Sequence, residues 1–106
     1  MRLEEVQRIA FQLIAHSGDA FDCYYRAIGT AQDGDYQKAH ELMKEGDEKL
    51  NDAHTSQARL LQVESQQEEI PFSIIMTHAQ DHLTMAISWQ RLASLIVRGM
   101  EKNGKL

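Results

Sequence analysis

The chain has 106 residues, of which 42% are hydrophobic and 25% are charged, and its formal net charge is −5. This length allows one domain spanning residues 1–106, and the composition is that of a folded globular protein rather than a disordered chain. The negative charge argues against nucleic acid and anionic membrane surfaces as partners, because a phosphate backbone requires a basic footprint.

Cysteine content and hydropathy indicate where the protein works. Cys23 is the single cysteine, so no disulfide framework is possible within the chain, and we interpret it as a small buried apolar residue. The first residues lack the apolar core of a secretory signal, and no run of 18 apolar residues occurs anywhere. We therefore expect a cytoplasmic protein.

The first helix is predicted over about residues 2–31. Its apolar stripe comprises Val6, Ile9, Ala10, Leu13, Ile14, Phe21, Tyr24 and Ile28. Gly18 interrupts this stripe, and we expect it to allow a bend or a close helix contact. The helix is followed by the turn residues Asp33, Gly34 and Asp35, of which Asp35 is a good N-cap for the next helix.

The second helix is predicted over about residues 36–64. Within its apolar stripe His54 and Gln57 are polar, so they need hydrogen-bond partners if they are buried. A polar connector covers residues 65–69. Pro71 is expected in the first turn of a third helix that runs to about residue 102. Short connections between three helices of similar length predict an all-α, antiparallel up-down-up three-helix bundle.

The third helix has an unusually wide apolar face. On a helical wheel its apolar residues span roughly 220°, whereas a helix packed on one core needs little more than about 100°. The surplus surface must be covered elsewhere, and a second copy of the chain is the simplest cover. We therefore predict a homo-oligomer whose third helices meet near a symmetry axis.

His78, Asp81 and His82 are spaced i, i+3 and i+4 on this helix, so their side chains share one face. The wheel places both histidines within the apolar arc and Asp81 at its edge. The purely structural alternatives are that His78 is a hydrogen-bonded core histidine and that Asp81 pairs with His82 or His78. If symmetry gathers several buried copies of Asp81, a hard cation such as Mg²⁺ would relieve their repulsion.

The same spacing also suits a transition metal. His78, Asp81 and His82 within one chain would suit an ion such as Zn²⁺ in a non-catalytic helical bundle. The glutamate that follows the first histidine of helical zinc proteases is absent, which argues against hydrolysis. No ATP-binding signature is present either.

The segment from Pro71 to Leu83, Pro-Phe-Ser-Ile-Ile-Met-Thr-His-Ala-Gln-Asp-His-Leu, resembles the lactose/cellobiose-class enzyme IIA of the bacterial phosphoenolpyruvate-dependent sugar phosphotransferase system. Residues 18–20 (Gly-Asp-Ala), 34–36 (Gly-Asp-Tyr) and 53–57 (Ala-His-Thr-Ser-Gln) are also similar to that family. The resemblance therefore extends over nearly the whole chain.

This resemblance implies a homotrimeric phosphotransferase component that takes part in the uptake of a lactose-, cellobiose- or chitobiose-type sugar. His78 would accept a phosphoryl group from the phosphocarrier HPr and pass it to a cysteine of enzyme IIB. Asp81 would meet its two symmetry mates around one Mg²⁺ ion on the trimer axis, and Gln80 and His82 would support the site. Residues 60–90 contain no Lys or Arg, so a phosphoryl group on His78 would find no cation in its own segment.

Overall fold

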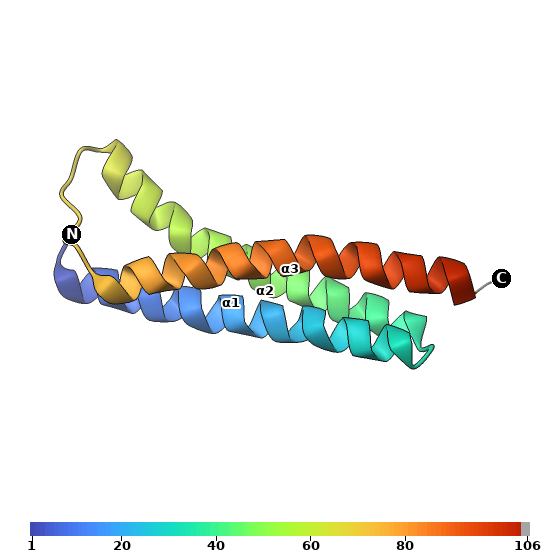
Figure 1. Cartoon of the computed structure of the whole chain (residues 1–106). Helices are drawn as coiled ribbons and strands as arrows, with labels where there is room; N and C mark the ends of the chain where they lie inside the picture. The colour runs from blue at the N-terminus through green and yellow to red at the C-terminus, as the bar shows by residue number, and fades with distance from the viewer. Residues whose placement is uncertain (105–106) are drawn as a thin grey trace.

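The computed structural model describes residues 1–104 and contains three long helices. These are α1 (Leu3–Gln32), α2 (Tyr36–Ser65) and α3 (Ile74–Gly104), and the described residues include no strand. Figure 1 shows that the chain traverses the length of the molecule three times, reversing between α1 and α2 and again between α2 and α3. The prediction of an all-α three-helix bundle is confirmed. The last two residues of the predicted domain lie outside the described residues.

The first two helices lie within one residue of their predicted limits. The Asp35 side chain accepts a hydrogen bond from the backbone N–H of Lys38 at 3.1 Å, which confirms this residue as the N-cap of α2. Gly34 has φ +84°, a conformation that favours glycine, and it allows the tight reversal before that cap.

The expectation that Pro71 lies in the first turn of α3 is wrong. The helix begins three residues later, at Ile74. The Ser73 hydroxyl accepts a hydrogen bond from the Met76 N–H at 3.3 Å, and the Ser73 carbonyl accepts one from the Thr77 N–H at 3.1 Å. Serine is a strong N-cap because its side chain satisfies a free amide of the first turn, and Ser73 fixes the start of the helix in this way.

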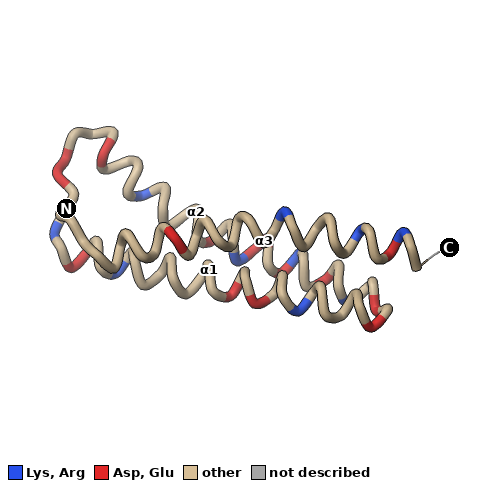
Figure 2. The backbone as a smooth tube through the Cα atoms, viewed as in Figure 1, with Lys and Arg blue, Asp and Glu red and all other residues tan. Residues whose placement is uncertain are grey.

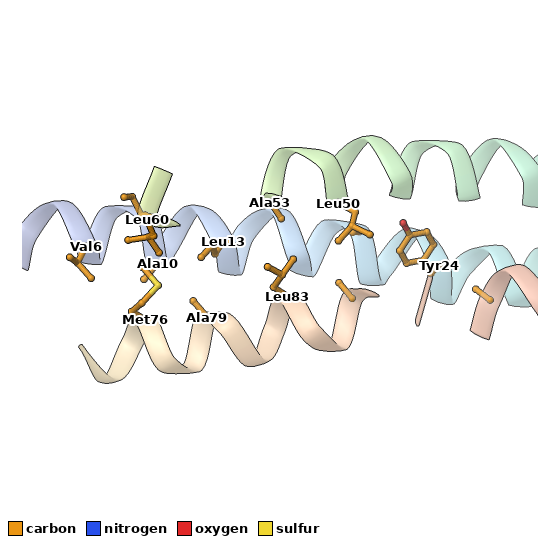
Figure 3. Packing of buried hydrophobic residues seen from close by; sticks show 14 residues of the cluster. Val6, Ala10, Leu13, Tyr24, Leu50, Ala53, Leu60, Met76, Ala79 and Leu83 are labelled. Carbon is orange, nitrogen blue, oxygen red and sulfur yellow. The ribbon is translucent and has the colours of Figure 1, made fainter. Parts of the chain in front are cut away.

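Each helix buries one seam of residues spaced three and four apart, and these seams form the core. In α1 the buried seam is Val6, Ala10, Leu13, Ser17, Ala20, Tyr24, Ala27 and Ala31. The buried residues of α3 are Met76, Ala79, Leu83, Ala86, Ala93 and Val97. Alanines are frequent in both seams, so the helix backbones approach closely, with leucines and methionine filling the space between them (Figure 3).

The C-terminal part of α2 diverges from the other two helices, and residues 66–73 close the gap as an extended connector (Figure 1). The Gln57 amide of α2 donates a hydrogen bond to Gln80 Oε1 of α3 at 2.7 Å. This bond supplies the partner expected for Gln57, whereas His54 is exposed and needs none from the core. Over the described residues, none of the helices combines the length and the apolar character needed to cross a membrane.

A close contact between α1 and α2 occurs at Gly46, not at Gly18. Tyr24 is completely buried, and its hydroxyl donates a hydrogen bond to Asp47 Oδ1 at 2.7 Å. The same oxygen accepts a second hydrogen bond from the Gln90 amide at 2.8 Å. Burial, together with the Asp47 carboxylate, raises the pKa of Tyr24 far above its usual value, so the phenol stays neutral. A Cβ atom at Gly46 would lie only 2.6 Å from the Tyr24 ring, whereas one at Gly18 would meet nothing within 4 Å.

Gly46→Ala should therefore destabilise the bundle by about 1–3 kcal/mol, because the buried Tyr24 ring has to move to admit the methyl group. The matched variant Gly18→Ala should instead stabilise it by about 0.5–1 kcal/mol, since α1 gains helix propensity without a clash. Urea unfolding followed by circular dichroism measures both changes. Equal effects of the two substitutions would contradict this account of the α1–α2 contact.

Candidate functional site

His78 and His82 form a hydrogen-bonded pair one turn apart on α3. Their Nε2 atoms lie 2.9 Å apart, and the rings meet edge to face with centroids 4.5 Å apart and an interplanar angle of 85°. His78 is exposed and His82 is half-buried, so the pair lies at the surface with His78 outermost. Since a hydrogen bond needs one donor and one acceptor, one Nε2 carries a proton and the other presents its lone pair.

Asp81 lies on the same face but does not join the imidazole pair. The two histidines bond to each other, so the predicted pairing of Asp81 with a histidine is not what the structure shows. The Asp81 carboxylate is exposed to solvent in the single chain. Within residues 1–104 no group of three or more His, Cys, Asp or Glu residues is arranged to hold a metal ion.

His78 and Asp81 belong to a second seam of α3, which faces away from the core of its own chain. Its residues, separated alternately by four and three positions and all exposed, are Ile74, His78, Asp81, Met85, Ser88, Leu92, Leu95 and Gly99. We call these eight residues the outer seam. Its four large apolar side chains are each at least half exposed, and Ile74 reaches 77%. Alternating spacings of three and four are the signature of a helix surface that packs against parallel or antiparallel helices.

Gln80 lies on another side of α3, where it contacts α2. Its Oε1 accepts the hydrogen bond from Gln57, and its amide nitrogen lies 3.5 Å from the Met76 sulfur. Within one chain the structure therefore brings together His78 and His82 but not Gln80. Gln57 holds Gln80 against α2, a contact that was not predicted from the sequence, although the polar side chain of Gln57 at an apolar stripe position was a signal.

The electrostatic setting of His78 has two features. The first half of α3 carries no Lys or Arg (Figure 2). Arg59, the cation that precedes the stretch of residues 60–90, forms an ion pair with Glu5, with 3.7 Å between Nη2 and Oε2. His78 is the fifth residue of α3, because the helix starts at Ile74 and not at Pro71. It is therefore only about one turn from the free amides of the helix start.

Cys23, the chain's one thiol, is no part of this site. It is buried in α1, and burial raises its pKa above the usual value, with the carboxylates of Glu45 and Asp22 adding to the shift. A protonated, buried thiol is a poor nucleophile, which agrees with its interpretation as a small core residue.

Comparison with known proteins identifies the family. The family model for the phosphotransferase system lactose/cellobiose-specific IIA subunit matches residues 8–101. The lactose-specific EIIA component of Staphylococcus aureus (strain N315) is 41% identical over 87 residues, covering 82% of this chain and 84% of that protein.

Two solved structures share the fold. The phosphotransferase system cellobiose-specific enzyme IIA from Bacillus anthracis superimposes with a TM-score of 0.92 at 34% identity, covering 99% of this chain and 94% of that one. The IIA(chitobiose) subunit in its solution complex with HPr, from Escherichia coli, gives a TM-score of 0.80 at 27% identity, covering 93% and 96%. The chain is thus a member of the lactose/cellobiose-specific IIA subunit family of the sugar phosphotransferase system.

Proposed function

We propose that this protein is a phosphocarrier in which His78 accepts a phosphoryl group from HPr and passes it to a cysteine of enzyme IIB. The observation that carries this proposal is the exposed His78 imidazole, held by His82 in the segment that the family model covers. The E. coli relative in complex with HPr supports HPr as the donor. The sugar would be of the lactose, cellobiose or chitobiose type.

The geometry supports a simple transfer step. When His82 Nε2–H is the donor, the lone pair of His78 Nε2 accepts that hydrogen bond, and His78 is a neutral nucleophile. His78 Nε2 attacks the phosphorus, the new P–N bond forms, and the P–N bond to the HPr imidazole breaks, leaving its electron pair on that nitrogen. The His82 N–H then loses its acceptor and is free to donate to a phosphoryl oxygen.

The absence of Lys and Arg between residues 60 and 90 suits a relay. A cationic clamp would stabilise the phosphorylated state and slow the second transfer, in which the IIB cysteine sulfur attacks the phosphorus and the P–N bond to His78 breaks. A neutral donor such as His82 orients the group with a smaller stabilisation than a guanidinium gives. Gln80 would support the site indirectly, by tying α2 to α3 through Gln57.

We further propose that three copies associate through their outer seams to form a parallel homotrimer, in which His78, near the N-terminal end of the seam, stays accessible to HPr. The four large apolar residues of the seam supply the surface that such an assembly buries. The three Asp81 carboxylates then lie near the symmetry axis, and oxygen ligands of this kind suit a Mg²⁺ ion. The ion would neutralise their mutual repulsion, and it has no part in the transfer step.

A second candidate, a helical bundle that binds a transition metal through His78, Asp81 and His82 of one chain, has less support. Such a site needs its ligands gathered around one point. The imidazoles instead bond to each other, and the described residues hold no group of three ligands within reach of one ion.

Phosphoryl transfer can be tested with phosphoenolpyruvate, enzyme I and HPr. The protein should acquire an acid-labile, alkali-stable phosphate, and His78→Ala should abolish the label because the nucleophile is gone. His82→Ala should still be labelled, and its labelling rate should fall by no more than about tenfold, since one hydrogen bond to the charged phosphoryl group is lost. His16→Ala, which removes a histidine of α1, serves as the control. Labelling that survives His78→Ala, or its absence from the unaltered protein, would overturn the proposal.

Substituting Asp81 separates the contribution of the ion from that of seam packing to the proposed trimer. The unaltered protein should have a solution mass three times the 12.1 kDa of the chain, and Mg²⁺ should raise its thermal midpoint. Asp81→Leu should remain trimeric but lose this response to Mg²⁺, because packing along the seam holds the assembly. Asp19→Leu, at an exposed carboxylate of α1, should retain the response. Collapse of Asp81→Leu to a monomer would show that the ion, not the seam, holds the copies together.

A further inference from the structure

The two flanks of the outer seam differ in chemistry. One flank consists of the residues that directly follow seam positions, Ile75, His82, Trp89 and Ile96. The opposite flank consists of the residues that directly precede them, Thr77, Thr84, Arg91 and Arg98. Towards the C-terminal half of α3, one side of the seam is therefore aromatic and apolar, and the other side is basic.

The aromatic flank extends from α3 onto α1. Trp89 meets the Phe21 ring edge to face at 5.0 Å, and Tyr25 lies 6.3 Å from Trp89 and 6.4 Å from Phe21, measured between ring centroids. Tyr25 remains 62% exposed, although it belongs to this cluster. A hollow of about 290 Å³ lies beside it, lined by Tyr25, Trp89 and neighbouring residues of α1 as far as Gln32. We call Phe21, Tyr25 and Trp89 the aromatic flank.

The basic flank borders a groove between α2 and α3. This groove has a volume of about 360 Å³, and Arg91 and Arg98 line it together with the apolar side chains of Met43 and Leu95. Asp47 also lines it, and one oxygen of its carboxylate already accepts hydrogen bonds from Tyr24 and Gln90. Leu95 is 62% exposed. Arg98 is oriented by a hydrogen bond from its Nε to the Ser94 carbonyl at 3.2 Å, which leaves its terminal nitrogens available. We call Arg91 and Arg98 the basic flank.

The two flanks lie at the same height on α3, between residues 89 and 98. When parallel helices pack around a rotation axis, each helix presents the residues before its seam to the residues after the seam of the next helix. The aromatic flank of one copy thus faces the basic flank of its neighbour. Arginine guanidinium groups stack favourably on Trp and Tyr rings, and the long stem of the side chain packs against apolar surface.

We propose that the occupant of the Arg91–Arg98 groove is a second copy of this chain, whose Tyr25 and Trp89 rings pack against the two guanidinium groups. The inference rests on the proposed parallel assembly, but it requires no phosphoryl transfer. Because the contact joins two different surfaces, it repeats around the ring until the ring closes. It also selects the parallel orientation, since reversing one helix would move its aromatic flank away from the arginines.

Charge exchange tests this pairing, and Trp89, the single tryptophan of the chain, reports on it. Tyr25→Lys places a cation opposite the neighbour's arginines, and the exposed position allows the substitution without disturbing the core. The variant should dissociate at a concentration at least about tenfold higher than the unaltered protein, with Trp89 emission shifted to longer wavelength. Adding Arg91→Glu to Tyr25→Lys should restore most of the association. Arg26→Glu, at an exposed arginine of α1, should not restore it.

Several results would overturn the proposal. One is a Tyr25→Lys variant that associates as strongly as the unaltered protein with unchanged Trp89 emission, and another is rescue by Arg26→Glu as complete as rescue by Arg91→Glu. An unaltered protein that is monomeric would refute both this contact and the proposed trimer. Labelling of His78 by phosphoenolpyruvate, enzyme I and HPr, measured on the same samples, tests the phosphocarrier function separately. Circular dichroism confirms that each variant is folded.

Discussion

The structure depends on one property of α3, which carries two apolar seams while its own chain covers only one. The inner seam, which consists of the buried residues Met76, Ala79, Leu83, Ala86, Ala93 and Val97, packs against the rest of its own chain. The outer seam, from Ile74 to Gly99, is exposed along its whole length. Exposed leucine, isoleucine and methionine at regular heptad spacing are costly in water, because burying each such side chain is worth about 1.5–3 kcal/mol.

The residues that we propose to be functional lie where that uncovered seam begins. His78 and Asp81 occupy successive positions of it, and His82 is adjacent to it. One surface therefore carries both the proposed nucleophile and the carboxylate that we propose is shared between copies. In this proposal assembly and phosphoryl transfer are linked by position, because the helix that would organise the copies also holds the imidazole.

Much of this arrangement follows from local patterns in the sequence. Helical periodicity, the Asp35 cap and the turn at Gly34 place α1 and α2 to within a residue, and the wide apolar face of the third helix indicates surface that one chain cannot cover. The start of α3 was missed because Pro71 and Ser73 both favour a helix start, and the side-chain bond from Ser73 decides between them. The sequence does not show which cap is used.

The remaining differences involve contacts between helices. Gly18 and Gly46 look alike in the sequence, yet only Gly46 faces the Tyr24 ring of the neighbouring helix. Gln80 belongs to the same segment as His78, residues 71–83, but its amide oxygen accepts a hydrogen bond from Gln57 on α2. The aromatic flank likewise joins residues of α1 and α3 that are far apart in the chain. Such contacts depend on how the helices are rotated against one another, and periodicity alone does not fix that rotation.

The claim that copies meet along the outer seam is tested most directly by cysteine cross-linking. Ser88 is an exposed seam residue one heptad after Asp81, and Asn51 is an exposed residue of α2 away from the seam. In a Cys23→Ala background, Ser88→Cys should form covalent dimers on mild oxidation, because a disulfide needs its two Cα atoms within about 7 Å. Asn51→Cys should remain uncrosslinked under the same conditions. A Ser88→Cys protein that cross-links no better than Asn51→Cys would contradict the account.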